Sequence, residues 1–187
     1  MSLSHALADA ILATEPLVTR YLDGFNDRNA VTQLPNLPNH VAWSVGHLAL
    51  SMHRAAEKIS GKTFELTYAP EPFAMGSRPT ALGRDYPPLQ ELTGRFHKSI
   101  ALLADAVRAA DDEGLKRSVP WGPTTISARD LALRMVFHNG THAGQIVDLR
   151  RGLGMPKVIP PPPAAAGAAA AGGTSGKPVG TSGPRKA

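Results

Sequence analysis

The segment FHNGTHAGQIVDLRR, residues 137–151, combines two local signals that conflict. Asn139-Gly140 is a dipeptide typical of tight turns. The histidines on either side of it, His138 and His142, are four residues apart, which is the spacing that places two side chains on one face of a helix. On a helical wheel both histidines fall inside the apolar stripe of the surrounding residues. We therefore predict a helix, with the Asn-Gly pair on another face, where Gly in place of Ala costs about 1 kcal/mol.

Three further stretches with apolar residues at helical spacing precede this helix. They cover about residues 3–24, 39–60 and 88–112, and the last helix begins near Ser127 and ends in Arg150-Arg151-Gly152. Helices of about 20 residues can each bury one apolar stripe against the others. The sequence therefore predicts an all-α fold, a four-helix bundle.

Individual residues predict how these helices begin, end and connect. Pro16 should kink or divide the first helix, while Asn39 is a candidate N-cap and Gly61 a candidate stop for the second. The proline-rich connection 61–87 is too long for a tight hairpin, so it predicts a crossover between the second and third helices. At most one short strand is expected, near residues 63–68.

The composition changes at the C-terminal end of the chain. Residues 155–187 are rich in Pro, Ala, Gly and Ser and have little to bury, so we predict a disordered tail there and one folded domain at 1–154. The tail carries four basic residues and no acid, which leaves 16 basic and 15 acidic residues in 1–154. This near balance argues against nucleic acid as a partner of the domain.

Other bulk features narrow the class of protein. The 187 residues include no cysteine, which excludes thiolate metal sites and cysteine nucleophiles and fits a cytoplasmic protein. No apolar run reaches the length of about 18 residues that a membrane-spanning helix needs. The N-terminal residues lack the basic segment of a signal peptide, so we expect no membrane association.

The two histidines of the last helix raise the question of a metal site. Buried imidazoles cost free energy unless their nitrogens have partners, and two at this spacing can share one divalent ion. Hydrogen bonding within the core is the alternative for an isolated pair. A zinc peptidase is excluded, because position 139 is Asn where that motif has its catalytic Glu.

A third ligand would decide between these alternatives. His47, on the helix predicted at 39–60, is the best candidate, although the wheel places it on a shoulder of that helix rather than in mid-stripe. His40 lies seven residues earlier, about 10 Å along the axis, and suits a helix-end or supporting position. Trp43 and Gln145 are candidates for the pocket wall, with ordinary packing as the alternative for each.

Two segments together resemble a known family. LPNHVAWSVGHLALSMHR, followed some 80 residues later by FHNGTHAGQIVDLRR, is similar to the DinB/YfiT superfamily of metal-dependent four-helix-bundle proteins. In that family a histidine in a W-S-x-G-H-L context joins an H-x-x-x-H pair on the last helix. The matching positions are His47, His138 and His142. The resemblance covers about residues 3–153 and leaves out the tail.

The resemblance implies a bundle with a crossover, frequent homodimers, and a divalent metal such as nickel, zinc or iron. Some relatives use a low-molecular-weight thiol as cosubstrate. Three histidine ligands leave a coordination position open, which is typical of catalytic rather than structural sites. We therefore expect an enzyme of small molecules, a thiol S-transferase or a hydrolase. The alternative is a non-catalytic metal- or ligand-binding protein related to stress.

Overall fold

The computed structural model describes residues 1–159, and most of the predicted tail, residues 160–187, lies outside this range. The fold is mostly helical and includes one small antiparallel sheet of two strands. Its elements in chain order are α1 (Leu3–Leu12), α2 (Glu15–Tyr21), α3 (Val41–Ser60), the 3₁₀ turns η1 (Glu71–Phe73) and η2 (Gly83–Asp85), α4 (Leu89–Arg108), α5 (Asp112–Lys116), β1 (Ser118–Trp121), β2 (Thr124–Ser127) and α6 (Ala128–Gly152).

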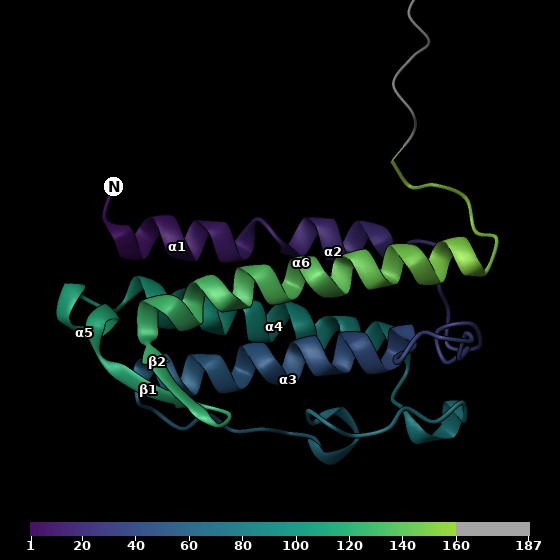
Figure 1. The fold of residues 1–187 in the computed structure, drawn as a ribbon, viewed down its shortest axis with the longest axis horizontal. Coiled ribbons are helices and arrows are strands. Elements are labelled where there is room, and N and C mark those ends of the chain that lie inside the picture. Colours follow the sequence, from purple (N-terminus) through teal and green to yellow (C-terminus); the bar gives the residue numbers. More distant parts are fainter. Residues whose placement is uncertain (160–187) are drawn as a thin grey trace, which may run out of the picture.

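The long helices lie side by side around one apolar core (Figure 1). α3 packs against α4 and α6, and α1 packs against the same two helices from the other side. α1, α2 and α6 run in one direction while α3 and α4 run in the other (Figure 1). Because α3 and α4 are parallel, the connection between them has to return along the length of the molecule. The crossover predicted for residues 61–87 is present.

The first predicted helix is divided in two, as Pro16 suggested. α1 ends at Leu12, and α2 begins at Glu15 with Pro16 in its first turn. A proline has no N–H to donate and is tolerated only in the first turn of a helix, so the break falls just before it. Thr14, at this junction, donates its hydroxyl to the carbonyl of Ile11 at 2.7 Å.

The N-cap of α3 was assigned wrongly to Asn39. The cap is His40, whose Nδ1 accepts a hydrogen bond from the backbone N–H of Trp43 at 3.1 Å. An imidazole is not among the usual capping groups, so Asn39 was preferred over His40. The other end was predicted correctly, because Gly61 ends the helix in the left-handed conformation at φ 71°.

The prediction of an all-α fold needs correction. β1 and β2 form a hairpin between α5 and α6, whereas residues 63–68 contain no strand. The hairpin loop is Gly122-Pro123, and Gly122 has the positive φ of 58° that the first position of such a tight loop requires. Strands of four residues are too short to show a clear alternating pattern, and for this reason the sequence did not reveal them.

α6 is the helix predicted from the histidine segment. Ser127 caps it by accepting a hydrogen bond from the Asp130 N–H at 3.0 Å. The left-handed glycine after its C-terminus is Gly154 rather than Gly152. Asn139 lies on a different face of α6 from the histidines, as predicted, but this face is not open to solvent. Asn139 is fully buried, and its amide donates to the Thr14 hydroxyl at 2.8 Å, because α6 packs against α1 and α2 as well as against α3.

Within residues 1–159, no helix combines the length and the apolar character needed to cross a membrane.

Candidate metal centre

The three histidines predicted as ligands lie together between α3 and α6. α3 supplies His47, and α6 supplies His138 and His142. Each offers one ring nitrogen, and these three atoms all lie within 4.8 Å of one another. The shoulder of α3 that carries His47 is covered by α6, so its side chain is only 9 % exposed. Packing of the two helices therefore brings together residues that are about 90 positions apart in the chain.

The spacing of two of the nitrogens fits a shared metal ion. Nε2 of His47 and Nε2 of His138 are 3.3 Å apart. Two nitrogens that bind one tetrahedral zinc ion at 2.0–2.1 Å are separated by about 3.3 Å. The other ring nitrogen of His138, Nδ1, is buried without a hydrogen-bond partner in the described residues. The donor set and its spacing thus suit a divalent ion of the zinc, nickel or iron type.

The ring of His47 is held so that one particular nitrogen faces α6. Its Nδ1 lies 2.7 Å from the carbonyl oxygen of Phe73, which can only accept a hydrogen bond. Nδ1 must therefore carry the proton, and Nε2 is left with a free lone pair. Orientation of a metal-binding imidazole through its second nitrogen is the usual arrangement in metal sites.

The carbonyl of Phe73 can reach His47 because residue 46 is glycine. A Cβ atom at Gly46 would lie 2.2 Å from the Phe73 ring, well inside contact distance. Phe73 is 2 % exposed and belongs to η1, in the crossover connection. Gly46 therefore lets the aromatic ring pack directly against α3, which places the carbonyl of the same residue on the imidazole.

Burial keeps the histidines neutral. Desolvation, with a smaller contribution from the neighbouring imidazoles, lowers the pKa of His138 to about 4 and that of His142 to about 3. The pKa of His47 is also lowered by burial, although the Phe73 carbonyl opposes the shift. A metal ion binds only the neutral form of histidine. At neutral pH all three side chains are therefore ready to act as ligands.

Two of the three predicted supporting residues, Trp43 and Gln145, lie beside this cluster, and the third, His40, lies at the helix end. Trp43 stacks on His47 with ring centroids 4.6 Å apart, and its Nε1–H donates to the Ser77 hydroxyl at 2.8 Å. Gln145 lies one turn after His142, and its side chain opposes the fall in the pKa of that residue. His40 is fully buried at the N-terminus of α3, the helix-end position expected for it. Direct contact of any of the three with a ligand stays a prediction.

A cavity of about 660 Å³ opens onto two of the histidines. Its wall includes His47, His138, the apolar side chains of Leu50 and Met135, and Trp121 from the hairpin. The hairpin of β1 and β2 therefore lines one part of the cavity. The volume suits a small organic molecule.

The sequence did not identify two other contributors to the site. Phe73 acts through its backbone carbonyl, which no side-chain pattern can reveal. Met75 lies across the cavity from the helices and comes from the same irregular connection. The glycine that precedes His47 was the one available signal, because Gly within a helix often marks the close approach of another chain segment.

Comparisons with known proteins concern the family and the fold of the chain. The family model described as the DinB superfamily matches residues 10–146, which include all three histidines. A crystal structure of a conserved protein from Enterococcus faecalis has a similar fold, with a TM-score of 0.66 and 17 % sequence identity. The likeness covers 81 % of this chain and 97 % of that one. No curated protein matches the sequence.

Proposed function

This chain belongs to the DinB superfamily, and from that premise we propose that it is a metal-dependent enzyme of small molecules. His47, His138 and His142 are the proposed ligands of one divalent ion. One observation carries the proposal. The Nε2 atoms of His47 and His138 are 3.3 Å apart, a spacing that suits two ligands of one ion. The overall arrangement that we propose for the long helices is the four-helix bundle of this family.

The open side of the cluster supports catalysis rather than a structural role. A divalent ion held by three neutral imidazoles would supply Lewis acidity toward a substrate and would activate a nucleophile such as water or a thiol. In the described residues the cavity wall contains no carboxylate. No carboxylate of this wall is therefore available as a general base. Transfer of a small thiol to an electrophile, or hydrolysis of a small substrate, are the two reaction classes that we propose.

The residues around the site prepare it before any substrate arrives. The Phe73 carbonyl fixes the tautomer of His47, and Trp43 covers the face of the same ring. His142 is 6 % exposed and lies beneath the other two histidines, away from the cavity wall. Such fixed ligands need little reorganisation when the substrate binds. Low reorganisation is a main source of the catalytic efficiency of preorganised sites.

Metal analysis of the purified, untagged protein tests the proposal. We expect about one equivalent of a divalent metal in the natural protein and a near-complete loss in the His142→Ala variant. A His97→Ala variant is the matched control, because His97 lies on α4 and bonds to Thr19 rather than to the cluster. Absence of metal from both proteins, even after incubation with nickel, zinc, iron and manganese salts, would contradict the metal site.

A non-catalytic metal- or ligand-binding protein is the alternative function. The same metal content would be found, so activity has to separate the two. The metal-loaded protein should react with at least one pair of a low-molecular-weight thiol and an electrophile, or with a small ester or amide. Metal binding without any turnover across such a panel would favour the alternative.

We also propose a homodimer formed through the outward face of α6. Leu133 and Phe137 are one helical turn apart on this face and are 49 % and 76 % exposed. Gly140 and Gly144 continue the same helix with open space around them, which permits close approach of a second chain. The molar mass from light scattering should fall by half in a Phe137→Glu variant. A cytoplasmic location stays a prediction.

A further inference from the structure

The cavity beside the histidines carries an unusual set of charges. Arg54 and Lys58 from α3 and Arg134 from α6 all line it, and no acidic side chain does so in the described residues. Within residues 1–159 none of the three forms an ion pair with a carboxylate. Glu57, the acid nearest to them on α3, is occupied elsewhere, because it accepts the N–H of Phe64 at 3.1 Å.

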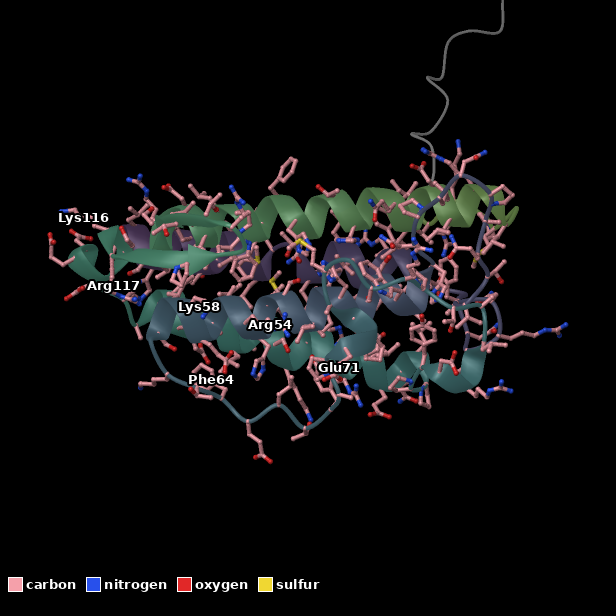
Figure 2. The ribbon with its side chains drawn as sticks, turned by 60° about the horizontal axis from the view of Figure 1, so that its bottom comes forward. Arg54, Lys58, Phe64, Glu71, Lys116 and Arg117 are labelled. Atoms are coloured by element: carbon pink, nitrogen blue, oxygen red, sulfur yellow. The ribbon has the colours of Figure 1, made fainter. Side chains whose placement is uncertain are left out.

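Several other helical arginines in residues 1–159 have acidic partners. The pairs are Arg95 with Glu91, Arg108 with Asp105, and Arg151 with Asp148. Each lies within one helical turn, the arrangement that stabilises a helix. Arg54 and Lys58 instead form a like-charged pair at the spacing of four residues, which destabilises a helix slightly. Figure 2 shows these two side chains one after the other along α3, with Arg117 farther on toward α5.

The cations lie on the same side of the histidine cluster. Arg54 follows His47 by seven residues on α3, while Arg134 precedes His138 by four residues on α6. Since α3 and α6 run in opposite directions (Figure 1), both arginines are displaced toward the hairpin. At a rise of 1.5 Å per residue these displacements are about 10 Å and about 6 Å. Long arginine side chains can span much of that distance.

The remaining wall of the cavity is largely apolar. Leu50, Met75, Trp121 and Met135 are its large apolar residues. Leu50 lies between His47 and Arg54 along α3. Met135 lies between Arg134 and His138 along α6. A molecule that fills the cavity would therefore have a reacting end at the histidines, an apolar middle and a negative charge at the far end. Arg150, near the C-terminus of α6, is unsuited to this role, since it is buried and donates to the backbone carbonyls of Tyr21 and Pro156.

We propose that the substrate or cosubstrate is a small organic anion, a carboxylate or phosphate, whose charged group binds Arg54 and Arg134. Lys58, at the rim, adds to the attraction. This inference rests on the proposed function, because it assumes that the reacting end lies at the metal ligands. Arginine suits such a role, since its guanidinium binds carboxylate and phosphate oxygens through two parallel hydrogen bonds.

Two thiols of equal length test the proposal on the full 187-residue chain loaded with Co²⁺. 6-Mercaptohexanoate carries a terminal carboxylate, and 6-mercaptohexanol carries a neutral hydroxyl in its place. Binding of either is followed by the sulfur-to-cobalt charge-transfer absorption, which needs no turnover. We expect the acid to bind about tenfold more tightly than the alcohol, the gain typical of one charge-assisted hydrogen-bond pair. The preference should shrink at high salt, because the arginines are solvent-exposed.

Variants assign the preference to individual residues. Arg54→Gln and Arg134→Gln should each remove most of it while cobalt binding stays intact. Arg151→Gln, which removes a charge from the far end of α6, should leave it unchanged. Equal affinity for the two thiols, or no binding of either, would overturn the proposal. Failure to bind cobalt at all would overturn the proposed function and this inference with it.

Discussion

His40 caps the N-terminus of α3 and His47 lies seven residues later on the same helix, and the two differ in how their ring nitrogens are engaged. At the N-terminus of the helix, both ring nitrogens of His40 are engaged by protein, Nδ1 by the Trp43 N–H and Nε2 by the Thr80 carbonyl at 2.9 Å. In the middle of the helix, His47 has only Nδ1 engaged by a protein carbonyl, and its Nε2 faces His138. Burial is similar at the two sites, so it does not distinguish a structural histidine from a ligand. What differs is that one nitrogen of His47 faces another imidazole instead of a backbone group.

The comparison therefore separates two consequences of mutation. Loss of His40 should affect folding, because its hydrogen bonds connect the helix end to the crossover segment. Loss of His47 should affect metal binding. The following experiments test this separation, in order of the expected size of the effect.

His47→Ala should remove metal binding, with a loss of affinity of about a thousandfold or more. The reason is that one of the three proposed ligands is lost, and the two remaining histidines cannot replace it. Competition with a chromogenic chelator measures the affinity. An unchanged affinity would mean that the histidines are core residues that do not share an ion.

Gly46→Ala should lower metal affinity by about ten- to a hundredfold without removing a ligand. The new methyl group would displace the Phe73 ring, and the carbonyl that orients His47 would move with it. Gly94→Ala, in the middle of α4, is the matched control. A Cβ at Gly94 meets no atom within 4 Å, so this change should stabilise the helix by up to about 1 kcal/mol. Equal metal affinity in the two variants would show that Phe73 does not position His47.

His40→Ala should reduce the free energy of unfolding by about 2 kcal/mol and leave one equivalent of metal bound. The loss combines a helix N-cap with a buried hydrogen bond to the Thr80 carbonyl. Urea unfolding of the metal-free protein measures the first effect and elemental analysis the second. Loss of metal at unchanged stability would place His40 among the ligands.

Metal affinity should change less than about fivefold between pH 7.5 and pH 6. Three histidines with the ordinary pKa of 6.5 would lose about fiftyfold over this range, because protons would compete for their nitrogens. In this protein burial holds the pKa of His138 at about 4 and that of His142 at about 3, so both stay neutral at pH 6. A fall of fiftyfold would show that the cluster is open to water.

Because burial lowers the pKa values of His138 and His142, the stability of the metal-free protein should also depend on pH. In the unfolded chain the histidines regain a pKa near 6.5 and bind protons that the folded metal-free protein excludes. The histidine contribution to stability is therefore complete above pH 6.5 and is lost as the pH falls from 6.5 toward 4. Between pH 7.5 and pH 5.5, the free energy of unfolding measured with urea should fall less for His142→Gln than for the natural protein.

The helices were predictable because their signals are local. The stripe around His138 and His142, the break at Pro16 and the stop at Gly61 each depend on residues within one or two turns. The hairpin and the buried position of Asn139 were not predictable in this way. Four-residue strands carry little periodicity, and the exposure of a helix face depends on how many neighbours the helix has.

By itself the sequence determined which residues are the candidates for the site: a histidine pair on one helix face, a third histidine in a matching context, and no cysteine at all. Only the tertiary structure decided the state of those residues. It selected the free nitrogen of His47 through the Phe73 carbonyl, lowered the pKa values through burial, and brought Arg54 and Arg134 to one end of a shared cavity. The physical reason is that residue type and spacing are local properties. Desolvation, hydrogen-bond occupancy and charge proximity depend on segments that meet only when the chain folds.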